Sequence, residues 1–149
     1  MTEESLADQL VKFDLFSQFS TIEAKEIAAH FQRKKFVSND HIISMGEGSH
    51  DVFFLLSGTA KVLTYTLVGN EVLLGQLEAP TYFGELTAID GGQRSAEIVA
   101  ETDCETLFVS GDAFKDILMS NPEVMLKLLG KFSRLLRQSN YNLVLQSSI

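Results

Sequence analysis

The middle of the chain, from about residue 34 to residue 109, is a series of short apolar or alternating runs separated by turn residues. The runs that most resemble strands lie at residues 41–45, 52–56, 59–67, 71–77 and 104–109. The separators contain residues that tolerate positive φ, and they are Gly46-Glu47-Gly48, Ser57-Gly58 and Val68-Gly69-Asn70. Evenly spaced short strands favour a closed barrel or a jelly roll, because such folds leave few strand edges exposed.

Helical patterns flank this strand-rich region on both sides. Residues 3–12 are modestly amphipathic, and Ser20 and Glu23 fit a capping box at the start of a helix that runs to about residue 31. Helical periodicity returns at residues 111–119, and Asn121-Pro122 marks the start of a long helix. We therefore expect a mainly β fold, a double-stranded β-helix or jelly-roll barrel, with N-terminal helices and a long C-terminal helix. The expected division of this single domain, residues 1–149, is N-terminal helices over 1–33, the barrel over 34–110 and C-terminal helices over 111–146.

The charge of the chain limits the partners it can have. Its 149 residues carry 12 basic and 20 acidic side chains, which gives a formal net charge of −8. Such a chain repels phosphate backbones, so direct binding of nucleic acid is not expected. No apolar run reaches the roughly 18 to 20 residues of a membrane span, and the start of the chain lacks the pattern of a signal peptide. The sequence predicts a cytoplasmic protein that does not bind membranes.

Residues that hold metals or perform catalysis are scarce. The single cysteine, Cys104, lies in an alternating run and is interpreted as a small buried apolar residue. The histidines, His30, His41 and His50, form no HxH or HExxH pair. We therefore expect no metal site, no catalytic residue and no cofactor. An enzyme on a cupin-like jelly roll would need clustered metal ligands that this sequence does not show.

The segment from Tyr82 to Ala96 has the strongest chemical pattern in the chain. Gly84 ends an apolar stretch, residues 85–89 fit one short helical turn, and Arg94 is expected to begin a strand. A helix start and a guanidinium both favour an anion, whereas the Glu85 carboxylate is a good acceptor for a sugar hydroxyl. This combination suggests a ligand with an anion and a hydroxyl close together. The alternative is an ordinary salt bridge between Glu85 and Arg94, with glycines that only turn the chain.

Two motifs in the sequence resemble a known family. Gly84-Glu85-Leu86 followed by Arg94-Ser95-Ala96 is similar to the phosphate-binding cassette of cyclic nucleotide-binding domains. Upstream, residues 15–19 and 43–58 are similar to the barrel signature of the same family, so the resemblance spans about residues 15–140. Among the branches of the family, the sequence most resembles the effector domain of bacterial cyclic-AMP receptor (catabolite activator) transcription factors. Those proteins continue into a helix-turn-helix domain, whereas this sequence stops at Ile149.

The resemblance implies a role for each matching residue. Glu85 matches the acid that accepts the ribose 2′-hydroxyl, and Arg94 matches the arginine that pairs with the cyclic phosphate. Gly84 and Leu86 match positions whose backbone lines the sugar and the phosphate. Ser95 occupies a position where threonine is associated with cyclic GMP, so serine favours cyclic AMP and leaves cyclic GMP open. The ligand-binding positions implied by the resemblance are Gly84, Glu85, Leu86, Arg94, Ser95, Ala96, Ser139 and Asn140.

The long C-terminal helix contributes the last two of these positions and a surface for a partner. Alignment with the receptor's helix places Ser139 and Asn140 where a polar pair contacts adenine, one residue reaching in from the partner subunit. A solvated helix face is the alternative for this pair. Leu129, Leu136 and Leu143 recur every seven residues. This stripe either packs on its own domain alone or joins a second copy, and we expect a homodimer through it.

These expectations combine into one function with an alternative. The chain is expected to be a non-enzymatic sensor that binds a cyclic nucleotide, with cyclic AMP preferred. Binding would reposition the C-terminal helix and so signal to a partner or to an output domain. The alternative is a related oligomerisation or sensor domain that binds another small molecule or none.

Overall fold

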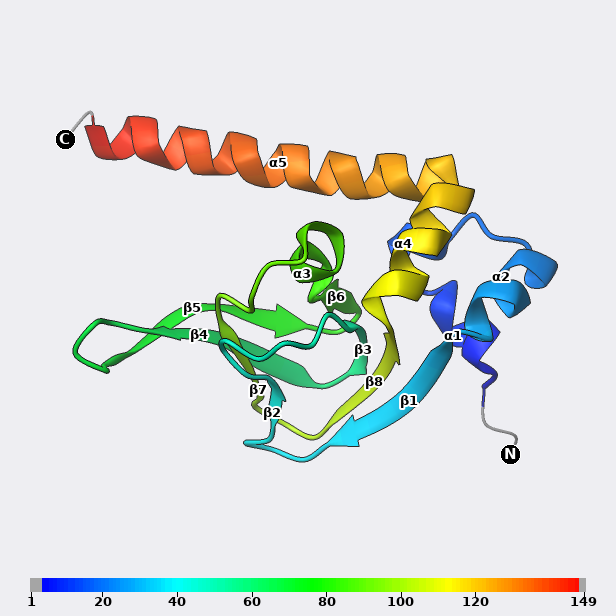
Figure 1. The fold of residues 1–149 in the computed structure, drawn as a ribbon, viewed down its shortest axis with the longest axis horizontal. Helices are drawn as coiled ribbons and strands as arrows, with labels where there is room; N and C mark the ends of the chain where they lie inside the picture. Colours follow the sequence, from blue (N-terminus) through cyan, green and yellow to red (C-terminus); the bar gives the residue numbers. More distant parts are fainter. Residues whose placement is uncertain (1–3, 148–149) are drawn as a thin grey trace.

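The computed structural model describes residues 4–147, and the side chains of residues 4–139. Two four-stranded antiparallel sheets face each other in the centre of the molecule (Figure 1). One sheet has the order β1-β8-β3-β6 and consists of Phe31–Phe36, Cys104–Val109, Val52–Ser57 and Thr81–Phe83. The other has the order β2-β7-β4-β5 and consists of His41–Ile43, Glu97–Ala100, Thr59–Tyr65 and Glu71–Glu78. The expectation of a mainly β barrel with flanking helices is confirmed.

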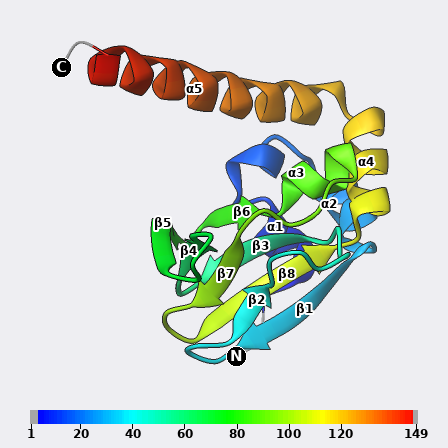
Figure 2. The same cartoon turned by 60° about the vertical axis from the view of Figure 1, so that its left-hand side comes forward.

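Helices cover one end and one side of this barrel. The N-terminal elements are α1 (Leu6–Leu10), the 3-10 helix η1 (Asp14–Phe16) and α2 (Thr21–Ala28), and the later ones are α3 (Glu85–Asp90), α4 (Gly111–Ser120) and α5 (Pro122–Ser147). The N-terminal elements and α4 gather at one end of the barrel (Figure 1). From there α5 runs across one side of the barrel and passes over α3, an arrangement that both views show (Figures 1 and 2).

Strand β3 connects the helices to the barrel, because it contributes side chains to the hydrophobic cores of both. Its residues Val52 to Leu55 are all buried, because alternate side chains enter two different cores. Val52 and Phe54 pack against the helices, whereas Phe53 and Leu55 point into the barrel between the sheets. Both faces of this strand are covered, which is why its sequence is a continuous apolar run. The ring of Phe54 meets five other rings, those of Phe13, Phe16, Phe31, Tyr82 and Phe114.

Several predicted boundaries differ from the structure. The helix expected to reach residue 31 ends at Ala28, and β1 begins at Phe31, so the barrel starts three residues earlier than predicted. Only the two ends of β1 are buried, since Gln32 to Lys35 face solvent at the edge of the sheet. The sequence of β1 therefore lacks the alternation of apolar and polar residues by which a strand is predicted. The helix expected over residues 3–12 covers only Leu6–Leu10 in the described chain. The strand expected to begin at Arg94 begins at Glu97.

Other local predictions are confirmed. Ser20 Oγ accepts a hydrogen bond from the Glu23 amide at 3.2 Å, and the Ser20 amide donates to Glu23 Oε1 at 2.9 Å, which completes the capping box. Cys104 is buried, and its Sγ lies 3.4 Å from the carbonyl oxygen of Thr59. Asn121 acts differently from the expected cap of α5, because its side-chain amide donates to the carbonyl of Ile117 at the end of α4.

Candidate functional site

The backbone between β6 and α3 requires glycine at position 84. Gly84 has φ +91, in the left-handed region, and it immediately precedes α3. A Cβ at this position would lie 2.8 Å from the carbonyl oxygen of Asp51 and 3.1 Å from Arg94 Nη1. Glycine therefore allows the turn and also the close approach of the arginine. The short helical turn expected after Gly84 is confirmed as α3, and Gly91, again left-handed with φ +72, ends it.

Arg94 is buried under this turn. Its side chain comes from the loop between α3 and β7, and the residue is only 4% exposed. Nη1 donates to the carbonyl oxygen of Gly84 at 2.9 Å and to Thr87 Oγ1 at 2.6 Å, while Nη2 donates to the carbonyl oxygen of Asp51 at 2.6 Å. Nε lies 4.0 Å from Glu47 Oε1. The guanidinium thus connects α3 to the loop that precedes β3.

One nitrogen of this guanidinium, Nε, makes no hydrogen bond in the part of the chain that the structure describes. Among the described residues, Arg94 Nε is buried and has no hydrogen-bond partner. Burial lowers the pKa of Arg94, whereas the nearby carboxylates of Glu47, Asp51 and Glu85 act to raise it. Arginine remains charged under such conditions. A buried cation with an unused donor is unusual in a folded protein, because buried polar groups are nearly always paired, and such a donor is able to bind an anionic acceptor.

Glu85 is the second buried charge of the site. It is the first residue of α3 and is 7% exposed. Its Oε1 lies 3.0 Å from Nζ of Lys131 on α5, and that Nζ also lies 3.9 Å from the centre of the Tyr82 ring. Burial, and then the charges of Glu85 and Asp14, raise the pKa of the Tyr82 hydroxyl, so this side chain stays protonated. The alternative of a Glu85–Arg94 salt bridge is not what the structure shows, because Glu85 pairs with Lys131 and Arg94 with Glu47.

The remaining predicted positions divide between the cassette and α5. Leu86 is 58% exposed, Ser95 is exposed and Ala96 is half-buried, all within the turn and loop around Arg94. Ser139 is exposed on α5, about two helical turns beyond Lys131. Position 140 lies in the same helix, but the Asn140 side chain is outside the described residues. The structure thus gathers the cassette residues around α3, whereas Ser139 belongs to another element, α5.

Four contact residues were not predicted from the sequence. They are Glu47, Asp51, Thr87 and Lys131, which supply partners to Arg94 or Glu85. Thr87 had a usable signal, since it lies one helical turn after Gly84 in the same motif. No sequence signal pointed to Lys131, because its contact with Glu85 depends on how α5 packs over the cassette.

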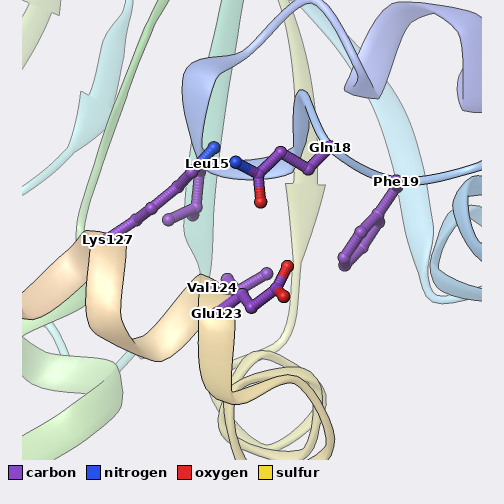
Figure 3. Close-up of a pocket in the computed structure, with 6 residues that line it drawn as sticks. All are labelled: Leu15, Gln18, Phe19, Glu123, Val124 and Lys127. Carbon is purple, nitrogen blue, oxygen red and sulfur yellow. The ribbon is translucent and has the colours of Figure 1, made fainter.

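A small surface pocket lies elsewhere on the domain. Figure 3 shows that side chains of η1, the segment after it and the first turns of α5 line this pocket, and they are Leu15, Gln18, Phe19, Glu123, Val124 and Lys127. Lys127 Nζ donates to the carbonyl oxygen of Asp14 at 2.7 Å and to Ser17 Oγ at 3.1 Å. These contacts fasten the start of α5 to η1 and do not involve the cassette.

Neither a metal-binding cluster nor a membrane-spanning helix is present in the described part of the chain. No group of three or more His, Cys, Asp or Glu side chains in this part of the chain could hold a metal ion. None of the described helices has both the length and the apolar character needed to cross a membrane.

Comparison with known proteins places this site in a family. The family model described as "Cyclic nucleotide-binding domain" matches residues 33–121, more than half of the chain. The "cAMP-activated global transcriptional regulator CRP" of Salmonella typhimurium is 29% identical over 110 residues, which are 73% of this chain and 52% of that protein. The chain therefore spans about half the length of the curated relatives it matches.

Solved structures agree with this match. The catabolite activator protein of Thermus thermophilus superposes with a TM-score of 0.79 and 28% identity, over 89% of this chain and 62% of that one. The sensor domain of the transcriptional regulator DNR from Pseudomonas aeruginosa gives a TM-score of 0.77 and 25% identity, over 89% of each chain. The first and the last of these relatives are described as transcriptional regulators. The chain belongs to the cyclic nucleotide-binding domain family, whose members are regulatory domains without catalytic activity.

Proposed function

We propose that this chain is a sensor module that binds a cyclic nucleotide, with cyclic AMP preferred, and that binding is read out through α5. The observation that carries the proposal is the buried Arg94 guanidinium, whose Nε has no acceptor among the described residues. It lies directly under Gly84, within the matched residues 33–121, in the motif that resembles a phosphate-binding cassette.

The cyclic phosphate is proposed to bind at Arg94. Glu47 is the ion-pair partner of Nε in this structure, and its separation of 4.0 Å is too long for a hydrogen bond. A phosphate oxygen at this donor would supply both a hydrogen bond and a counter-charge. Charge-assisted hydrogen bonds of this kind are about twice as strong as neutral ones. The backbone at Gly84 and Leu86, with the neighbouring Ser95 and Ala96, would line the same ligand.

The ribose is proposed to bind at Glu85. The carboxylate is buried at the start of α3, where it can accept a hydrogen bond from a hydroxyl without the cost of desolvating a new charge. Its position one residue after Gly84 keeps it close to the phosphate subsite, as a ligand with neighbouring phosphate and hydroxyl groups requires. Cyclic nucleotides have this arrangement, with a phosphate fused to the sugar that carries the free hydroxyl.

The preference for cyclic AMP rests on Ser95 and on relatives described as "cAMP-activated". Ser139 and Asn140 are proposed to contact the adenine base, since both lie in α5 beyond Lys131, the residue that contacts Glu85. Such a contact would give the ligand different affinities for different positions of α5, which is the condition for a signal.

A homodimer through α5 is also proposed. Leu129 and Leu136 of the predicted stripe are 54% and 66% exposed, and Leu126 and Leu135 beside them are 70% and 53% exposed. Large apolar side chains concentrated on one helix favour a partner surface. Leu143, the third member of the stripe, lies in the helix, but its side chain is outside the described residues. We also place the module in the cytoplasm. The net charge of −8 favours action on a protein partner or output domain over direct binding of nucleic acid.

Calorimetric titration with cyclic AMP, cyclic GMP and 5′-AMP tests the proposal. We expect micromolar or tighter binding of cyclic AMP, weaker binding of cyclic GMP and no binding of 5′-AMP. The substitution Ser95→Thr should move the preference toward cyclic GMP. If none of the three binds or raises the melting temperature, the cyclic-nucleotide proposal is wrong, and a domain that responds to another small molecule or to none replaces it.

A further inference from the structure

Helix α5 leaves the body of the domain one turn after its last buried residues. Val124 and Leu128 are buried in the helix-side core, and Phe132 is partly buried against it. All residues from 133 to 139 are exposed. Lys131 lies next to Phe132, and it contacts Glu85 of α3. Figure 1 shows that α5 passes over α3. A contact made here decides how firmly the far part of the helix is held to the cassette.

The contact that Lys131 makes is an ion pair with the cassette. Its Nζ is 3.0 Å from Glu85 Oε1 and 3.9 Å from the centre of the Tyr82 ring. The side chains of Lys131 and Glu85 are 29% and 9% exposed, so water screens this pair less than a pair on the open surface. A buried carboxylate needs a partner, and in this structure that partner comes from α5.

We infer that Lys131 is a positioning residue that occupies the ribose acceptor, Glu85, in the unliganded chain and leaves it when a cyclic nucleotide binds. This inference rests on the proposed function, in which a sugar hydroxyl donates to the same carboxylate. The hydroxyl and the ammonium compete for Glu85, so binding weakens the ion pair that holds α5 at its point of departure. Loss of that pair transmits occupancy of the site to the helix without any movement of the barrel.

Two neighbouring lysines on α5 allow a matched test. Lys127 lies one turn before Lys131 and also donates from α5 to another element, but its acceptors are Asp14 and Ser17. Lys127→Met therefore removes a comparable tether without touching the cassette. Lys131→Met removes the competing charge from Glu85, and Lys131→Arg keeps it.

The first measurement is the affinity of each variant for cyclic AMP by calorimetry. A partly buried ion pair that must be broken on binding is worth a factor of about three to ten, so Lys131→Met should bind cyclic AMP about three- to tenfold more tightly than the parent. Lys131→Arg should restore the affinity of the parent, and Lys127→Met should leave it unchanged. Unchanged or weaker binding by Lys131→Met would overturn the inference, because it would show that the lysine does not compete with the ligand.

The second measurement needs no ligand. A double-mutant cycle of Lys131→Met and Glu85→Gln in urea denaturation should show coupling between the two side chains, and hydrogen exchange in α5 should be faster in Lys131→Met. Cyclic AMP should raise exchange at the amides next to Lys131 in the parent, whereas the proposed base contact at Ser139 and Asn140 would protect amides further along α5. Protection of the amides next to Lys131 by ligand contradicts release of the tether. If the cycle shows coupling but the parent binds no cyclic nucleotide, the proposed function fails. If the parent binds and Lys131→Met binds equally well, only the inference about Lys131 fails.

Discussion

Replacing Arg94 with leucine is expected to weaken cyclic AMP binding far more than it weakens the fold. The guanidinium makes three hydrogen bonds to the protein, and its buried Nε, which makes none to the described residues, can donate to a phosphate oxygen. A hydrogen bond to a charged group contributes about 1.5 to 3 kcal/mol. The loss of one arginine–phosphate bond therefore lowers the affinity about 10- to 150-fold, and the loss of a two-bond contact lowers it further.

The same substitution has a smaller effect on stability because two changes oppose each other. The carbonyl oxygen of Gly84 keeps a donor in Thr87, but the part-buried carbonyl oxygen of Asp51 loses its donor from Arg94, which costs about 1 to 3 kcal/mol. The variant no longer has to keep a cation away from water, and this change is favourable. A domain with a free energy of unfolding of about 5 to 15 kcal/mol survives the difference.

The assay is calorimetric titration of the parent, Arg94→Leu and Arg94→Lys, with urea denaturation of each protein. Arg94→Lys keeps the charge but loses the planar pair of donors, so its affinity should fall between those of the other two. Arg33→Lys is the control, since Arg33 also bonds two protein groups, Gln9 and the backbone of Glu4, but lies on β1. A folded Arg94→Leu variant with the affinity of the parent would refute the assignment of Arg94 as the phosphate ligand.

Three further predictions concern the cassette, the dimer and a helix cap. Gly84→Ala should lower the free energy of unfolding by about 1 to 3 kcal/mol in urea titrations, because its φ is +91 and the new Cβ would meet a backbone oxygen at 2.8 Å. Leu129→Glu combined with Leu136→Glu should reduce the mass in solution, measured by light scattering, from that of a dimer to that of one chain; an unchanged dimer mass would exclude the stripe as the interface. Hydrogen bonds from Ser20, first from its backbone amide, lower the pKa of Glu23, so the stability from this carboxylate is present at neutral pH and is lost as the pH falls through the lowered pKa. The difference in free energy of unfolding between the parent and Glu23→Gln should therefore shrink on acidification, and a difference that is constant with pH would contradict the cap.

The strands that the sequence predicts well are those whose burial produces a clear pattern. The run at Val52 to Leu55 is buried on both faces, and Cys104–Val109 lies between two strands, so both are continuous or alternating apolar segments. β1 was not predicted, because its middle residues face solvent at a sheet edge. β6 has only three residues, which is too short for any periodicity to show.

The site divides in the same way between local and distant contacts. Gly84, Glu85 and Arg94 lie within eleven consecutive residues, so their motif is visible in the sequence. The partners of these residues cannot be recognised in the sequence, since Asp51 is 43 residues from Arg94 and Lys131 is 46 residues from Glu85. Those contacts depend on the packing of β3 and α5, and no spacing rule along the chain connects them.

Each charged group of the site has a partner of opposite charge before any ligand is present. A ligand must therefore replace these partners when it binds. Arg94 faces Glu47 at 4.0 Å, and Glu85 faces Lys131 at 3.0 Å, so each binding group has a partner of opposite charge from another part of the chain. In the proposed complex, a phosphate replaces Glu47 as the counter-charge of Arg94, and a sugar hydroxyl replaces Lys131 as the hydrogen-bond donor to Glu85. The loop before β3 supplies one displaced partner and α5 supplies the other. Because a single ligand replaces both, its affinity is the difference between the contacts it makes and those it breaks, and the broken contact to α5 is the one that can reach a partner or an output domain.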